Sequence, residues 1–147
     1  MSIENLINKI NDELNEYESS GTPSPADEEE INKFKREMER EFNYLIPSYL
    51  EELLSYSNGV MFNGLTIWPT QQYWLFHESF AEANLDLRER INENYIYFGN
   101  RDEELYIYNP ITNKYEGIEY IGDTAWVQFD SLDVMFEFML NRSLEED

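Results

Sequence analysis

The 147-residue chain contains no cysteine, only one histidine and few basic residues. Without cysteine, disulfide bonds, thiolate metal sites and cysteine nucleophiles are excluded. A single imidazole, His77, cannot build a histidine-rich metal site, and no Gly-x-Ser-x-Gly segment is present to support a serine hydrolase. Phosphate-binding glycine loops and dinucleotide fingerprints are also missing. We therefore expect no catalytic residues, no metal and no cofactor.

Long apolar runs are absent as well. No segment approaches the roughly 18 apolar residues that a membrane span requires. The first residues, from Met1 to Lys9, lack the basic start and continuous apolar run of a secretory signal. These absences predict a cytoplasmic protein.

Charge of one sign dominates the sequence. Acidic residues number 31 against 10 basic ones, which gives a formal net charge of -21. Such a chain repels phosphate backbones and anionic lipids, so we expect neither nucleic-acid nor membrane binding. Two interpretations of the acidity stay open. It can serve solubility alone, or it can attract a basic protein partner such as a nuclease domain.

The length fits one domain, which we expect to span residues 1–147. Apolar residues at intervals of three and four predict a first helix: Ile3, Leu6, Ile7, Ile10, Leu14 and Tyr17. The small polar segment that follows reads as a loop. We therefore divide the chain into an N-terminal helix and loop over 1–24 and a core over 25–147.

A second helix is predicted to start at Ser24, with Ser24 as the N-cap and Pro25 in the first helical position. The acidic run Asp27 to Glu30 then compensates the positive end of the helix dipole. The buried stripe of this helix is expected to comprise Ile31, Phe34, Met38, Phe42 and Leu45.

Turn chemistry defines the next segment. Pro47 suits the first turn of a third helix, and Asn58-Gly59 ends that helix. Asn63-Gly64 separates two β-rich runs and tolerates positive φ at both central positions of a type I′ turn. The sequence therefore predicts a short helix followed directly by a tight hairpin.

Further strands are predicted over 95–98, 105–109, 114–120 and 125–129, with a surface helix over 81–91. Ser131 can cap a last helix, which leaves 145–147 as an acidic tail. Alternation along the strands predicts a tyrosine-rich face of the sheet, with these residues on it: Tyr95, Tyr97, Tyr106, Tyr108, Tyr115 and Tyr120. Together these elements predict an α+β fold. N-terminal helices and a C-terminal helix pack on one face of a mainly antiparallel sheet of five or six strands.

The order of these elements resembles the SUKH superfamily, and especially its YrhA-like bacterial branch. The resemblance rests on the helix start Ile46-Pro47-Ser48-Tyr49, on Asn58-Gly59 and the hairpin, and on three later segments: Tyr95 to Gly99, Leu105 to Tyr108, and Phe129 to Leu140. It covers most of the chain from Ile31 onward but not residues 70–90. The resemblance implies a SUKH-like α+β fold and a role as an immunity protein that neutralises a bacterial toxin by direct binding.

Carboxylates expected to face solvent, on a helix face and at a hairpin tip, are the candidate partner-binding residues: Glu51, Glu52, Asp102, Glu103 and Glu104. We interpret the segment Asn100 to Glu104 as a hairpin turn, because it lacks the ligand spacing of an EF-hand loop. His77, beside Tyr73, Trp74 and Phe76, is interpreted as structural. Two other functions stay open, a regulatory or scaffolding module without a toxin partner and an enzyme that uses paired carboxylates.

Overall fold

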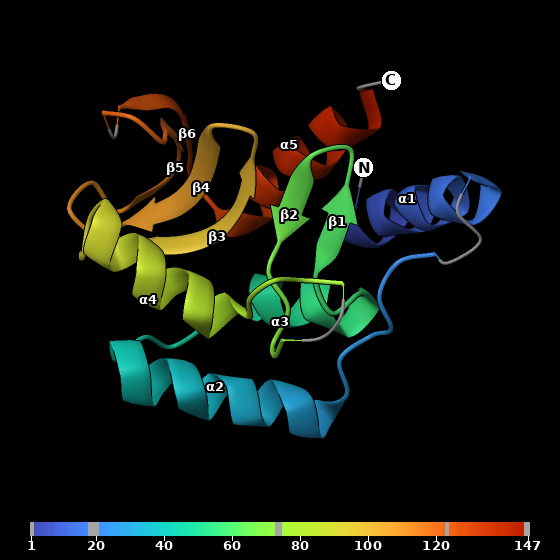
Figure 1. The fold of residues 1–147 in the computed structure, drawn as a ribbon, viewed down its shortest axis with the longest axis horizontal. Helices are drawn as coiled ribbons and strands as arrows, with labels where there is room; N and C mark the ends of the chain where they lie inside the picture. Colours follow the sequence, from blue (N-terminus) through green and yellow to red (C-terminus); the bar gives the residue numbers. More distant parts are fainter. Residues whose placement is uncertain (1, 18–20, 73–74, 123, 146–147) are drawn as a thin grey trace.

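The computed structural model describes residues 2–17, 21–72, 75–122 and 124–145. Within these residues the chain forms helices and strands in the order shown in Figure 1. The helices are α1 (Ile3–Tyr17), α2 (Glu28–Phe42), α3 (Ser48–Tyr56), α4 (Phe80–Arg90) and α5 (Leu132–Glu145). The strands are β1 (Val60–Phe62), β2 (Leu65–Ile67), β3 (Ile96–Arg101), β4 (Glu104–Asn109), β5 (Lys114–Glu119) and β6 (Ala125–Phe129).

The six strands form one antiparallel sheet in the order β1-β2-β3-β4-β5-β6, so each strand pairs with its neighbour in sequence. Helix α4 is inserted between β2 and β3. The predicted α+β class is confirmed, with an antiparallel sheet and with N-terminal helices and a C-terminal helix packed on it. No helix in the described part of the chain is both long and apolar enough to span a membrane.

Helices cover both faces of the central strands. Tyr106 of β4 packs against Phe138 of α5, with ring centroids 6.3 Å apart. The preceding residue, Leu105, points to the opposite face, because successive side chains in a strand alternate. There it lines a cleft together with Leu87 of α4. Helix α1 packs on α5, and α2 packs on α4, so the outer helices extend these two layers.

This second helical layer overturns the predicted tyrosine-rich face. Tyr97 and Tyr106 have no exposed surface, Tyr95 is also buried, and the remaining three of the six are half-buried. The register places Tyr97 opposite Ile107, and so on the α4 side, whereas Tyr106 lies on the α5 side. The prediction was wrong because it assumed that one face of the sheet is solvated. Helix α4 covers that face and buries Leu87 against it.

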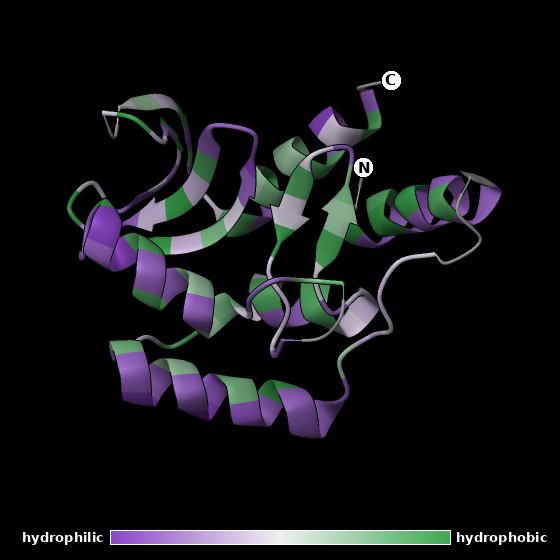
Figure 2. Cartoon of the chain, in the orientation of Figure 1, coloured by the Kyte–Doolittle hydropathy of each residue, from purple (hydrophilic) through white to green (hydrophobic). Residues whose placement is uncertain are grey.

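The start of α2 also differs from the prediction. The N-cap is Asp27, not Ser24, and Asp27 forms a capping box with Glu30. Ser24 lies in a preceding segment, where its carbonyl accepts a hydrogen bond of 3.1 Å from the backbone N–H of Asn58. Because this segment pairs with the end of α3, the helix begins three residues later than the local capping signal indicates. Figure 2 shows the hydrophilic outer side of α2.

The C-terminal end of α2 corrects one predicted core residue. The helix ends at Phe42, and Asn43 adopts a left-handed conformation with φ 52°. Leu45 therefore lies outside the helix and is 75% exposed, although the helical spacing predicted it to be buried. Phe34 and Met38 of the same predicted stripe are buried as expected.

The predicted helix and hairpin between residues 47 and 67 are present. Pro47 is the N-cap of α3, one position before the predicted first helical turn, and its φ of -69° suits the entry to the helix. The helix ends at Tyr56, shortly before Gly59, whose φ is 95°. The pair Asn58-Gly59 thus follows the helix end as predicted.

The turn between β1 and β2 is confirmed. Asn63 and Gly64 have φ values of 48° and 82°, and Phe62 pairs with Leu65 on either side of them. Positive φ at both positions is the requirement of a type I′ turn, which matches the right-handed twist of the strands. The Asn63 side chain also donates a hydrogen bond of 2.8 Å to the carbonyl of Ser143, which fastens this turn to α5.

The last helix follows β6 directly, as predicted. The backbone carbonyl of Ser131 accepts a hydrogen bond of 3.2 Å from the N–H of Met135. The Ser131 hydroxyl donates to the carboxylate of Asp133. Glu145 belongs to the helix, and the remaining predicted tail, residues 146–147, lies outside the described residues.

Candidate functional site

The five carboxylates predicted to bind a partner fall on two separate surfaces. Asp102 and Glu103 form the turn between β3 and β4, and Glu104 is the first residue of β4. Glu51 and Glu52 lie on α3, which Figure 1 shows between the β1–β2 hairpin and α2, away from this turn. The structure therefore brings the first three residues together and keeps the α3 pair apart from them.

The β3–β4 turn is a two-residue hairpin turn whose two residues are both carboxylates. Arg101 pairs with Glu104, so only Asp102 and Glu103 lie between the strands. Asp102 has φ 54°, a left-handed conformation that aspartate tolerates better than most residues. Both turn residues are exposed. The predicted hairpin is present, but its turn is shorter than the predicted segment 100–104, because Asn100 and Arg101 belong to β3 and Glu104 to β4.

The two glutamates on α3 have different surroundings. Glu51 forms an ion pair with Lys35 of α2, with 3.3 Å between the Lys35 Nζ and the carboxylate. Glu52 is exposed, and its backbone carbonyl accepts a hydrogen bond from the hydroxyl of Ser55. One of the two carboxylates is thus already neutralised by a contact between helices.

An open cleft lies beside the β3–β4 turn, on the side of the sheet that α5 covers. Its volume is about 710 Å³. We name it the turn cleft, and it is lined by Arg101, Asp102, Glu103, Glu104, Glu119, Tyr120, Ile121, Trp126 and Arg142. All three turn-region carboxylates predicted from the sequence are in this set.

Arg142 of α5 organises one wall of the turn cleft. Its Nη1 donates a hydrogen bond of 2.6 Å to Glu104 Oε1 and another of 3.0 Å to the Tyr106 hydroxyl. Its guanidinium carbon lies 5.3 Å from the ring centre of Trp126 and 5.7 Å from that of Phe138. A cation over aromatic faces and against a carboxylate is held in one orientation. The carboxylate of Glu104 and the rings of Trp126 and Phe138 thus bind one guanidinium at this wall of the cleft.

The hydroxyl of Tyr106 belongs to the same wall. Burial, together with the neighbouring Glu104 carboxylate, raises the pKa of Tyr106 to about 12, and Arg142 only partly opposes this shift. A phenol with this pKa is neutral at physiological pH, so it can donate to Glu104 as well as accept from Arg142.

The opposite wall is acidic and solvated. Asp102, Glu103 and Glu119 are exposed, and none of them takes part in an ion pair between described residues. Two apolar side chains border them: Ile121 is 78% exposed and Trp126 is 39% exposed. Solvated carboxylates next to exposed apolar and aromatic surface are a combination typical of a protein-binding surface for cationic partners.

A second cleft lies on the opposite side of the sheet, beneath α4, and has a volume of about 280 Å³. We name it the helix cleft. Its apolar floor is formed by Met61, Trp68, Phe76, Leu87 and Leu105, and its polar rim includes His77, Glu78, Arg90 and Asn100. Asp102 and Tyr120 line both clefts, so the two hollows meet at the β3–β4 turn.

Glu78 lies on the rim of the helix cleft, close to other charged groups. Burial raises the pKa of Glu78, and the nearby carboxylates of Asp86 and Glu82 add to the shift. Arg90 opposes it, but its Nη2 is held 2.6 Å from Asp86 and its Nη1 donates to the Tyr120 hydroxyl. These contacts fix Arg90 over the ring of Tyr120.

His77, predicted to be structural, has an exposed side chain on this rim. Of the predicted aromatic neighbours, Phe76 is buried, whereas Tyr73 and Trp74 lie outside the described residues. Among the residues that the structure describes, no three histidine or carboxylate side chains are grouped closely enough to hold a metal ion.

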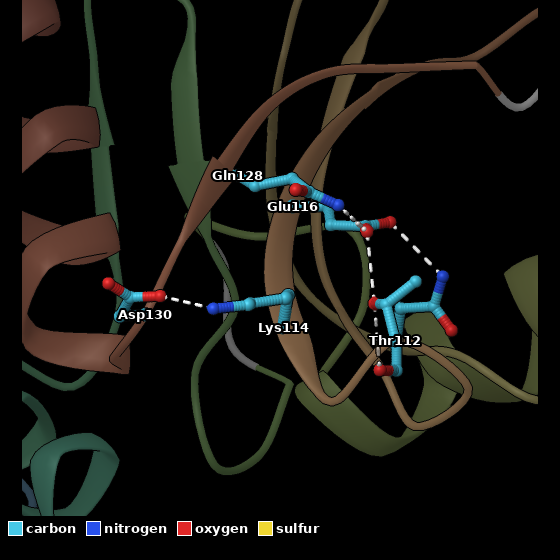
Figure 3. A network of polar contacts seen from close by, with 6 residues as sticks. Thr112, Lys114, Glu116, Gln128 and Asp130 are labelled. Carbon is cyan, nitrogen blue, oxygen red and sulfur yellow. Dashed lines mark hydrogen bonds and ion pairs between the residues drawn. The ribbon is translucent and has the colours of Figure 1, made fainter.

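Glu116 of β5 is a buried carboxylate that sequence reasoning missed. It is only 2% exposed and accepts hydrogen bonds from Asn109 Nδ2 at 3.2 Å, Thr112 Oγ1 at 3.1 Å and Gln128 Nε2 at 2.8 Å. Figure 3 shows Thr112, from the β4–β5 turn, and Gln128, from β6, converging on it, next to the Lys114–Asp130 pair. The network joins three consecutive segments of the sheet and has a structural role. The sequence did carry a signal, because Glu116 lies two positions before the buried Ile118 and so on the same face of the strand.

Trp126, Arg142 and Glu119 were also missed, although all three line the turn cleft. Arg142 lies four residues after Phe138 on α5, a spacing that places both side chains on one helix face. Trp126 lies on the last strand of the sheet, where one edge is open. Both signals depend on knowing that α5 and β6 are neighbours, which a single sequence does not reveal.

Comparison of the chain with models of known protein families and with curated proteins found no match.

Proposed function

We propose that this protein is a non-enzymatic binding domain that recognises a basic protein partner through the turn cleft. The observation that carries the proposal is the meeting of exposed carboxylates with exposed apolar surface at one end of the sheet: Asp102, Glu103, Glu119, Ile121 and Trp126. Aromatic residues in such a position supply binding energy, and unpaired carboxylates select a cationic partner.

The charge of the whole chain supports the same proposal. With a net charge of -21, the protein attracts a basic surface over a distance comparable to the Debye length, about 8 Å at physiological salt. Such a field raises the association rate, and the local arrangement at the turn cleft then fixes the orientation of the complex.

We further propose that the partner is a toxin, such as a nuclease domain, and that the protein acts as an immunity protein of the SUKH superfamily. Support comes from the sequence resemblance together with the observed order of helix, hairpin, strands and closing helix. A nuclease binds a polyanion, so its active cleft is basic. An acidic surface that occupies this cleft would block the substrate sterically and electrostatically.

Affinity capture from the native cells with three forms of the tagged protein tests the proposal. One is the wild type, one is the cleft variant Asp102→Asn/Glu103→Gln/Glu119→Gln, and one is the control variant Asp12→Asn/Glu13→Gln/Glu16→Gln on α1. Both variants remove one exposed aspartate and two exposed glutamates. We expect wild type and control to retain a stoichiometric basic protein that the cleft variant loses.

The captured protein is then expressed alone and together with this chain. Growth arrest that the wild type relieves, and that the cleft variant relieves poorly, is the result expected of an immunity protein. A captured protein without toxicity would instead favour a regulatory or scaffolding module. Equal capture by all three forms would contradict the proposed surface.

An enzyme that uses paired carboxylates is the second candidate, since Glu78 and Asp102 line the same helix cleft and the pKa of Glu78 is raised. The variant Glu78→Gln separates the two mechanisms. If neutralisation is by binding, the variant relieves growth arrest as well as the wild type does. Loss of relief with intact binding of the partner would favour an enzymatic mechanism.

A further inference from the structure

The open edge of the sheet lies next to the turn cleft. Strand β6 is the last strand in the sheet order, and among the described residues it pairs with β5 alone. Alternate backbone N–H and C=O groups of an edge strand point away from its neighbour and are available to another strand. Four of the five residues of β6 are exposed or half-buried, and Phe129 alone is buried.

The sequence of β6 is unusual for this chain. Charged residues make up 28% of the protein, yet Ala-Trp-Val-Gln-Phe contains none, and it contains no proline. Natural edge strands are commonly protected from pairing by charges, proline or very short length. The other edge, β1, has that protection by length, since it consists of three residues and Val60 is buried. The edge at β6 lacks all three kinds of protection.

The surroundings of β6 select the kind of strand that can pair with it. Glu119 of the turn cleft lies near one end of β6, where its backbone N–H donates to the carbonyl of Thr124. Asp130, at the other end, is already paired with Lys114, so Glu119 is the carboxylate left to attract a cation. Trp126 contributes its ring to the turn cleft, so side chains of a paired strand on that face would lie against this ring, at the edge of the cleft that Glu119 also lines. A second copy of this chain would bring another net charge of -21 to the same place, which disfavours self-pairing.

We infer that β6 is a docking edge for an extended basic segment of the protein partner, which adds a seventh strand while its lysine or arginine side chains reach the turn cleft. The inference rests on the proposed function and specifies how the same surface binds. In this mode, main-chain hydrogen bonds supply affinity, and the acidic cleft supplies selectivity for a cationic strand.

The test uses the full chain, isotopically labelled for NMR, and a synthetic peptide of alternating lysine and valine as the probe. Two matched peptides are N-methylated, one at the lysines and one at the valines, so charge and side chains are preserved. Only one set of amides in a paired strand faces β6. We therefore expect one methylated peptide to bind about tenfold more weakly, since each lost hydrogen bond contributes about 0.5–1.5 kcal/mol.

The amide signals of Ala125 to Phe129 are expected to shift most when the unmodified peptide binds. A peptide of alternating glutamate and valine should not bind. Equal binding of both methylated peptides, with shifts at Asp102, Glu103 and Glu119 only, would overturn strand pairing while leaving the proposed function intact. Absence of binding by the lysine peptide would also overturn the inference, as would β6 signals that depend on protein concentration alone, because the occupant would then be a second copy. The proposed function itself fails only if the capture and growth experiments fail.

Discussion

Glu104 and Glu116 are carboxylates on adjacent strands, β4 and β5, but their surroundings are opposite. Glu104 lies on the α5 side at the rim of an open cleft, where it pairs with the cation Arg142. Glu116 lies on the other face, opposite Ile107, and is buried among three neutral donors.

One residue type thus serves two purposes in this acidic protein. Around Glu116, hydrogen-bond donors replace water, so the carboxylate holds the β4–β5 turn and β6 together and is unavailable to a partner. Around Glu104, the cation and the aromatic rings form one wall, and further carboxylates remain in solvent. Net charge alone cannot separate these roles, whereas burial and donors do.

The largest expected effect is on stability at Glu116. Replacing Glu116 with Ala leaves the side chains of Asn109, Thr112 and Gln128 without their common acceptor, so we expect a loss of about 2–4 kcal/mol in the free energy of unfolding. Urea denaturation followed by circular dichroism measures this loss.

The control is Glu119→Ala, three residues along the same strand and exposed, which should change the unfolding free energy by less than about 0.5 kcal/mol. Equal unfolding free energies of the two variants would mean that the network around Glu116 makes no net contribution to stability, and would contradict the structural role given to Glu116.

A smaller loss is expected at Arg142. Removing this side chain by Arg142→Ala eliminates the hydrogen bonds to Glu104 and Tyr106 and the contact with the Trp126 ring. The expected cost is about 1–2 kcal/mol, because the pair is partly solvated. Thermal unfolding checks it against Arg40→Ala on α2, whose side chain is 70% exposed. A loss no larger than that of the control would contradict the role given to Arg142.

The dependence of stability on alkaline pH tests the surroundings of Tyr106 in the same wall. The pKa of Tyr106 is raised in the folded protein to about 12 from an ordinary value of 10.0, so the unfolded chain releases this proton first. The contribution of Tyr106 is therefore fully present below pH 10 and is lost as pH rises from 10.0 to about 12. We expect Tyr106→Phe to show a shallower loss of stability over this window than the wild type. Identical slopes in chemical denaturation would contradict the assigned environment.

The smallest effect is expected on α3. Glu51 is paired with Lys35, and both α3 carboxylates lie far from the turn cleft. We expect Glu51→Gln/Glu52→Gln to weaken capture of the basic partner less than Asp102→Asn/Glu103→Gln, which removes the same number of charges at the turn. A larger loss from the α3 variant, measured by quantitative capture, would place the interface on α3.

Local signals predicted most of the fold. Asn63-Gly64 fixes its turn through backbone φ alone, and the apolar spacing from Ile3 onward fixes α1, so neither needs information from distant residues. The cap of α2 shows where such signals fail. Ser24 has suitable chemistry, but its backbone is committed to Asn58, thirty-four positions along the chain, and Asp27 caps the helix instead.

The candidate site was predicted only where it depends on a turn. The Asp102-Glu103 turn could be recognised from two flanking β-rich runs, and with it the carboxylates that this turn brings to the turn cleft. Trp126 and Arg142, which line the same cleft, come from β6 and α5, whose packing is set by the whole sheet. The predicted tyrosine-rich face was wrong for the same reason. Alternation assigns residues to the two faces of the sheet but does not reveal that helices cover both faces.

The most direct test of the proposed interface is the affinity of one captured basic partner for three forms of the protein at low and high salt. These are the wild type, the cleft variant Asp102→Asn/Glu103→Gln/Glu119→Gln and the control variant Asp12→Asn/Glu13→Gln/Glu16→Gln. The account predicts that the control binds nearly as tightly as the wild type, while the cleft variant binds at least about tenfold more weakly with a smaller salt dependence. Equal weakening by the two variants would show that only the overall charge matters, and would contradict a specific surface at the β3–β4 turn.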